Sequence, residues 1–115
     1  MDVKMSTREA KGIAIIDLSG RITLGEACAA VRAEIQDQLG HGYKKILLNL
    51  GNVTYIDSAG LGELTAAYTS VKNREGVLKL VNLTKRVHDL MQITKLYTVF
   101  DVFDDEKSAA ASFGE

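Results

Sequence analysis

The sequence predicts an α/β domain built on a mixed, mostly parallel sheet of about five strands, with about four helices. Short apolar runs rich in branched side chains, such as residues 13–18 and 45–50, are typical of buried strands. Segments with apolar residues at helical spacing lie between these runs. Strands that alternate with helices imply βαβ units joined by right-handed crossovers. The 115 residues suffice for one domain, which we expect to span residues 1–115.

The first strand is expected to be the exception to the parallel arrangement. Residues 3–9 mix polar and apolar side chains, as an edge strand does, and Lys11–Gly12 indicates a turn into the strand at 13–18. A hairpin pairs its strands in antiparallel fashion, so the sheet should be mixed. Residues 19–22 are expected to lead out of the second strand towards a helix.

The first helix carries a recognisable start and stop. Thr23 and Glu26 fit a capping box, with Thr23 as the cap and Glu26 at the third helical position. Residues 40–42, Gly-His-Gly, should end the helix, because glycine suits the left-handed cap. Helical spacing predicts a buried face made of Cys28, Val31, Ile35 and Leu39.

The second half of the chain continues the alternation. Residues 77–82 should form another strand of the parallel set. Thr84 can cap a following helix from about Lys85 to Thr94. The apolar residues that this helix should turn inward are Val87, Leu90 and Met91.

The chain is expected to close with a short strand and a last helix. Residues 99–103 form an apolar run typical of a strand. Asp104 can cap a helix through about Ser112, whose end Phe113 should dock against the core.

The stretch from Tyr55 to Gly62 joins the strand at 45–50 to a helix and organises the rest of the chain. That helix should run to about Asn73, because apolar residues recur at helical spacing at Leu61, Leu64, Tyr68 and Val71. Asp57 or Ser58 stands where an N-cap would stand. Gly60 and Gly62 are poor helix formers in the first turn, and glycines leave a backbone open to close approach.

The sequence leaves two interpretations of Ser58 open. Serine is a preferred N-cap residue, so Ser58 could serve the helix alone. Alternatively, its hydroxyl is presented at the positive end of a helix, a place that suits an attached or bound phosphate. Ligand and partner sites in such sheets tend to lie at the carboxyl ends of the strands, where both Ser58 and the loop at 19–25 are expected.

Residues 57–62, Asp-Ser-Ala-Gly-Leu-Gly, resemble the D-S-[SA]-G-[LI] signature of the STAS domain, found in the anti-sigma factor antagonists of bacteria. The order of the expected elements around the motif also matches. The resemblance implies a STAS-like fold and a phosphorylation-controlled binding module of transcription regulation, not an enzyme. Unphosphorylated protein would bind a serine-kinase anti-sigma factor and release a sigma factor. Phosphorylation of Ser58 would end the binding.

The same resemblance implies which residues contact the partner. The expected binding set is Thr23, Tyr55, Asp57, Ser58, Ala59, Gly60, Leu61 and Gly62. One departure from the family concerns residues 20–23, Gly-Arg-Ile-Thr, because many antagonists carry G-x-[LI]-D there. Thr23 therefore stands in place of an Asp that lies near the phosphoacceptor in the family, which affects the detail of kinase docking and not the fold.

Other chemistries are poorly supported by the residues present. A serine hydrolase would need the G-x-S-x-G elbow around Ser58, but Ile56 occupies the position of the first glycine. Nothing in the sequence brings His41 or His88 close to Ser58. One cysteine and two separated histidines supply no metal-ligand spacing. No P-loop or dinucleotide fingerprint is present, so no cofactor is expected, and ATP enters only as the phosphate donor held by the partner kinase.

Composition narrows the partners and the compartment. A net charge of −1 gives no broad basic field for nucleic acid or anionic lipid. The apolar runs are shorter than the roughly 20 residues of a membrane helix, and the first four residues lack a signal-peptide core. With the single Cys28, these features predict a cytoplasmic protein. We expect a monomer or weak dimer. The family resemblance also implies a serine phosphatase that would reset the switch.

A second function remains open at this stage. A STAS domain can also be a subunit of a lipid transporter or of a larger signalling assembly, with a structural contact and no phosphate switch. That role predicts copurification with membrane ATPase subunits, whereas the switch predicts a soluble kinase.

Overall fold

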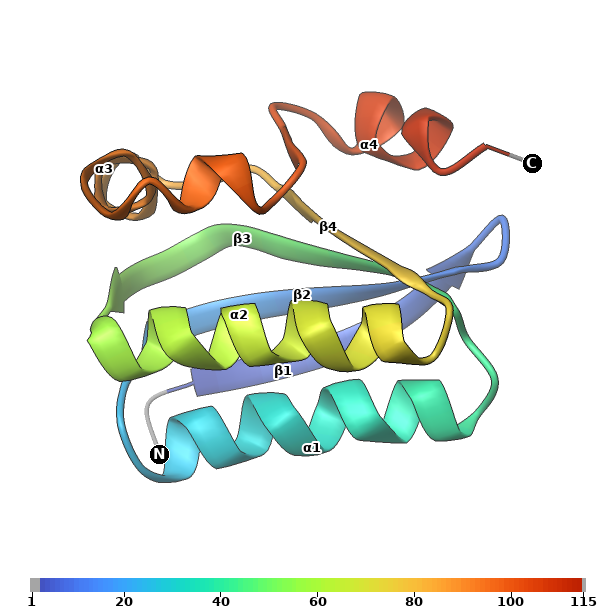
Figure 1. The fold of residues 1–115 in the computed structure, drawn as a ribbon, viewed down its shortest axis with the longest axis horizontal. Coiled ribbons are helices and arrows are strands. Elements are labelled where there is room, and N and C mark those ends of the chain that lie inside the picture. Colours follow the sequence, from blue (N-terminus) through green and yellow to red (C-terminus); the bar gives the residue numbers. More distant parts are fainter. Residues whose placement is uncertain (1–2, 115) are drawn as a thin grey trace.

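A single five-stranded sheet, with helices against both of its faces, organises residues 3–114, the part of the chain that the computed structural model describes (Figure 1). Residues 1, 2 and 115 of the expected domain lie outside the described residues. The strands are β1 (Val3–Ala10), β2 (Ile13–Ile22), β3 (Lys45–Ile56), β4 (Val77–Val81) and β5 (Val102–Phe103). They follow one another across the sheet in chain order. Only the β1–β2 pair is antiparallel, so the predicted mixed, mostly parallel α/β fold is confirmed.

Helices cover the two faces of the sheet unequally. The described residues form α1 (Glu26–Gly40), α2 (Ser58–Asn73), α3 (Lys85–Thr94), α4 (Glu106–Ser112) and the short 3₁₀ helix η1 (Leu96–Thr98). Figure 1 shows α1 and α2 side by side on one face, α4 on the other, and α3 at the end where β3 finishes. Two successive crossovers of one hand that advance in one direction place both of their helices on the same face.

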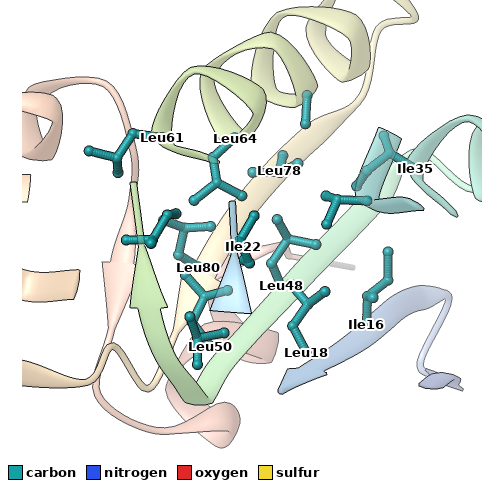
Figure 2. Packing of buried hydrophobic residues seen from close by; sticks show 14 of the residues in the cluster. Ile16, Leu18, Ile22, Ile35, Leu48, Leu50, Leu61, Leu64, Leu78 and Leu80 are labelled. Atoms are coloured by element: carbon teal, nitrogen blue, oxygen red, sulfur yellow. The ribbon is translucent and has the colours of Figure 1, made fainter. Parts of the chain in front are cut away.

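The main hydrophobic core lies between the sheet and the pair α1 and α2 (Figure 2). Branched aliphatic side chains from β2, β3 and β4 meet the apolar stripes of the two helices there. The predicted buried face of α1 is confirmed, with Cys28, Val31, Ile35 and Leu39 all buried. A smaller cluster on the opposite face joins α4 to the sheet through Ile13, Ile15, Leu47, Val81 and Ala109, and Phe113 packs against it as predicted.

β3 is longer than the sequence indicated. It continues through Gly51 to Ile56, and β2 likewise continues through residues 19–22. The pairing of the two strands shifts register between Asp17 and Ser19 and again after Gly20, so β3 carries extra residues there. Such bulges break the apolar alternation of β3, and for this reason the pattern alone ended that strand too early. β2 ends with Ser-Gly-Arg-Ile, which is not an apolar run, so its end was missed as well.

The expected cap of α1 at Thr23 is wrong. The helix begins at Glu26, and its N-cap is Gly25, at φ 102°, which makes no side-chain cap hydrogen bond. Backbone carbonyls take the place of the capping box, because the Cys28 N–H donates to the carbonyl of Thr23 at 3.3 Å. The left-handed turn at Gly25 places the start of the helix two residues later than the spacing predicted.

The end of the chain also departs from expectation. The final strand spans only residues 102–103, since η1 occupies 96–98 and Phe100 is buried in the main core. The cap of α4 is Asp105, not Asp104: its carboxylate accepts from the Ser108 N–H at 2.7 Å. Asp104 and Asp105 are adjacent and chemically identical, so the sequence alone could not show which of them caps α4.

Truncation of Leu64 tests the phase of α2. This side chain is fully buried against the sheet, so Leu64→Ala should lower the free energy of unfolding by about 2–5 kcal/mol. Leu24→Ala is the control, because Leu24 is 78% exposed and its loss should change stability by no more than about 0.5 kcal/mol. Urea titration of both variants measures the difference, and equal losses would contradict the packing.

Candidate functional site

The candidate site lies at the end of the sheet where β3 runs past its neighbour. β4 pairs only with residues 45–49 of β3, so residues 50–56 extend beyond β4 and pair with β2 alone. α2 begins directly after this extension, at Ser58. Figure 1 shows α3 at the same end of the molecule. The loop after β2 and the turn before α2 therefore meet at the carboxyl ends of their strands, as predicted.

Asp57 holds these two connections together. It is the N-cap of α2, and its Oδ1 accepts from the Gly60 N–H at 2.8 Å. Its Oδ2 accepts from the N–H of Leu24, in the loop after β2, at 3.1 Å. These two N–H groups hold the pKa of the Asp57 carboxyl below its usual range, the Gly60 contact contributing most. The sequence left the N-cap of α2 open between Asp57 and Ser58, and the structure shows that Asp57 is the cap.

Gly60 is required by the protein's own packing. A Cβ atom at this position would lie 2.3 Å from the backbone oxygen of Ile22 and 2.6 Å from Cγ1 of Ile56. Gly60 is buried, so the group that approaches its backbone is β2 and not a partner. Gly62 differs, since it is exposed and a Cβ there would meet nothing within 4 Å.

Ser58 is the first residue of α2 and is exposed. Its interpretation as a plain N-cap is wrong, because Asp57 makes the cap hydrogen bond. The hydroxyl stands at the helix end where free N–H groups and the macrodipole favour negative charge. Of the other expected contact residues, Ala59 is half-buried and Leu61 is only 5% exposed, so Leu61 mainly anchors the turn.

A groove of about 580 Å³ runs from Ser58 to α3. Its lining is Tyr55, Ile56, Asp57, Ser58, Leu61, Arg86, Asp89, Leu90, Ile93 and Thr94. Two guanidinium groups stack on the Tyr55 ring, with Arg86 Cζ 4.6 Å and Arg21 Cζ 4.9 Å from its centroid. The groove thus combines an apolar floor with a cation and two carboxylates, and Ser58 lies on its wall.

Two exposed apolar side chains flank this region, and sequence reasoning missed both. Leu24 is 78% exposed beside the Asp57 cap, and Ile93 is 77% exposed on the α3 side of the groove. Arg86, which lines the groove and stacks on Tyr55, was missed as well. Two features of the sequence could have indicated these exposed side chains. Leu24 is an apolar residue in an otherwise polar turn, and Ile93 lies off the buried stripe that Val87 and Met91 form on α3.

Thr23 is half-buried in the loop before α1 and lies beside the turn, because Ile22 and Leu24 on either side of it are both hydrogen-bonded to Asp57. The groups considered for other chemistry are placed differently. His41 lies just past the opposite end of α1, and His88 lines a separate polar hollow with Asn49 and Asn82. Cys28 is buried, and burial raises the pKa of its thiol. Within residues 3–114 no three His, Cys, Asp or Glu side chains are grouped as metal ligands, and no helix has the length and apolarity to cross a membrane.

Comparison with known proteins gives one consistent result. A family model described as the STAS domain matches residues 4–109. BtrV of Bordetella bronchiseptica is 28% identical over 111 residues, covering 96% of this chain and 95% of its own length. The anti-sigma-B factor antagonist of Bacillus subtilis is 28% identical, covering 89% and 92%. The Bacillus cell fate determinant SpoIIAA, solved in its phosphorylated form, superposes with a TM-score of 0.72 at 19% identity, covering 95% and 98%.

The two glycines of the turn provide a matched pair of variants. Gly60→Ala should lower the free energy of unfolding by about 1–3 kcal/mol, because the added methyl group overlaps the Ile22 carbonyl. Gly62→Ala should raise it by about 0.5–1 kcal/mol, since the site is open and alanine favours the helix. Denaturant unfolding measures both, and the same sign for the two variants would contradict the turn geometry.

The Asp57 cap should contribute a pH-dependent part of stability. Its folded pKa lies below its unfolded value, so the stabilisation is present above pH of about 4 and is lost as pH falls through the folded pKa. Asp57→Ala should therefore be clearly less stable than the wild type at pH 7, and the gap should narrow towards pH 3. Urea unfolding across this range tests it, with the exposed Asp104→Ala as the control expected to show little gap at either pH.

Proposed function

The chain belongs to the STAS domain family, and on that premise we propose that it is an anti-sigma factor antagonist switched by phosphorylation of Ser58. The unphosphorylated protein binds a serine-kinase anti-sigma factor in the cytoplasm, and a sigma factor is released. The kinase then transfers phosphate from its own ATP to Ser58, which ends the binding, and a serine phosphatase reverses it. The chain itself acts as a binding module and not as an enzyme.

The position of Ser58 carries this proposal. The hydroxyl is exposed at the first residue of α2, and the cap is made by Asp57, so the fold does not need the serine for that purpose. An exposed hydroxyl that is free of a structural role can be modified without loss of the domain. The positive end of the helix also favours the charge of about −1.5 to −2 that a phosphate brings.

The surroundings of Ser58 suit a protein partner. Leu24 and Ile93 expose apolar side chains on either side of the turn, and the groove between Ser58 and α3 has an apolar floor. Burial of exposed apolar surface of this kind favours protein–protein association. The names of full-length relatives support the identity of that partner, since one is an anti-sigma-B factor antagonist.

A phosphate on Ser58 should oppose binding more strongly than it opposes folding. Within the free protein it remains in water. In the complex, a partner that covers Ser58 must bury the dianion next to the carboxylate of Asp57. An unpaired charge buried in an interface costs several kcal/mol, and each 1.4 kcal/mol is a tenfold change in affinity.

Binding of three forms of the protein to the cognate kinase tests the switch. Phosphorylated protein should bind at least about 100-fold more weakly than unmodified protein, by the cost of burying the charge. Ser58→Ala should bind without accepting phosphate, and Ser58→Asp should bind weakly, although one charge imitates two imperfectly. Titration calorimetry gives the affinities.

Ser6→Asp is the control for added charge alone. Ser6 is exposed on β1, away from the turn, so this variant should bind as the wild type does. If phosphorylated and Ser58→Ala proteins bind the kinase equally well, the switch is contradicted. Copurification with membrane ATPase subunits in place of a kinase would then support the structural-subunit role.

A further inference from the structure

We propose that Arg86 binds the phosphoryl group of modified Ser58, forming an ion pair that crosses the groove between α2 and α3. The inference rests on the proposed function only in assuming that Ser58 carries phosphate. It assigns the residue that receives this phosphate within the chain itself. It also gives the groove a second state, in which the pair covers the groove's apolar lining.

The first support is the placement of the two residues. Ser58 begins α2, Arg86 lies in the first turn of α3, and both line the same groove. Both side chains are exposed, so neither has to leave the core to meet the other. Arg86 Cζ lies 4.6 Å from the ring centroid of Tyr55, three residues before Ser58. The guanidinium is thus already held over the strand that leads into the phosphoacceptor.

The second support is that the carboxylates near Ser58 already have hydrogen-bond partners, whereas the Arg86 guanidinium contacts an aromatic ring. Asp89, the acidic side chain on the α3 wall, accepts from Lys85 Nζ at 2.8 Å. The carboxylate of Asp57 accepts from two backbone N–H groups. The contact that the structure gives Arg86 is with an aromatic face. Its guanidinium is therefore the lining cation best placed to receive a new anion.

A phosphate should compete well with the tyrosine ring for Arg86. Charge-assisted, bidentate guanidinium–phosphate hydrogen bonds are stronger than an exposed cation–π contact. The titratable groups that line the groove with Ser58 are Asp57 and Tyr55 from its own side and Arg86 and Asp89 from α3, whereas Arg21 contacts the Tyr55 ring without lining the groove. The two carboxylates repel the phosphate, and the N-terminal end of α2 and Arg86 attract it.

The proposed pair changes the surface that a partner meets. It would run from the start of α2 to the start of α3, over a groove lined by Ile56, Leu61 and Leu90. A partner side chain that enters this groove in the unmodified protein would meet a closed ion pair in the modified one. Phosphate would then oppose binding by covering the apolar lining as well as by its charge.

The phosphate pKa measures the contact directly. Phosphoserine is installed at position 58 during translation, so no kinase is needed, and its second ionisation is followed by ³¹P NMR. An adjacent guanidinium favours the dianion, so this pKa should be about 0.5–1 unit lower in the wild-type background than in Arg86→Gln. Arg86→Lys, which keeps the charge without the planar fork, should restore part of the difference.

Arg21→Gln is the matched control. It removes the same charge and the same kind of contact with Tyr55, but Arg21 does not line the groove. The phosphate pKa should change much less in this variant than in Arg86→Gln. Circular dichroism checks that every variant is folded, as expected for changes at exposed positions.

The outcomes separate this inference from the proposed function. A phosphate pKa that is equal in the wild-type and Arg86→Gln backgrounds, or that moves equally in Arg21→Gln, overturns the Arg86 contact and leaves the switch intact. Failure of the kinase to modify Ser58 would overturn the switch, but it would not alter the titration of installed phosphoserine.

Discussion

The carboxylate of Asp57 is the interaction on which the rest of the site depends. One oxygen caps α2 through Gly60, and the other holds the loop after β2 through Leu24. The Ile22 carbonyl then packs against Gly60 so closely that a methyl group there would force the backbone to shift. Two connections far apart in the sequence are thereby fixed to one point. Ser58 itself is exposed between two half-buried residues, Asp57 and Ala59.

The second constraint is the unequal length of the parallel strands. β3 extends seven residues beyond its pairing with β4, and bulges let it keep its pairing with β2 over that distance. β4 stops at Val81, and the chain turns at Asn82 with a positive φ of 62° before α3 begins. α3 therefore lies near the end of β3 and not over the middle of the sheet. The groove beside Ser58 is the space left between this helix and the start of α2.

Local chemistry in the sequence predicted most of the fold. Apolar runs located four of the strands and the turn at 11–12 located the first, and the cap at Thr84 and the ends of α2 and α3 agree with the structure. The sequence left the cap of α2 open between Asp57 and Ser58, and the structure assigns it to Asp57. The errors lie where tertiary geometry decides. Bulges hid the end of β3, a positive φ at Gly25 displaced the start of α1, and the burial of Phe100 shortened β5. The groove could not be predicted, because Tyr55 and Arg86 meet only through the packing of α3 on the strand extension.

The residues of the motif at 57–62 fall into two groups, those that face the protein interior and those that face solvent. Asp57, Gly60 and Leu61 face inward, and their identities follow from a cap, a close backbone contact and a buried side chain. Ser58 and Gly62 face outward, and no packing constraint explains them. Resemblance in the inward residues indicates a shared turn. Only the outward residues can carry a shared function. The proposed partner contact and switch therefore depend on Ser58 and on exposed side chains around it that lie outside the motif.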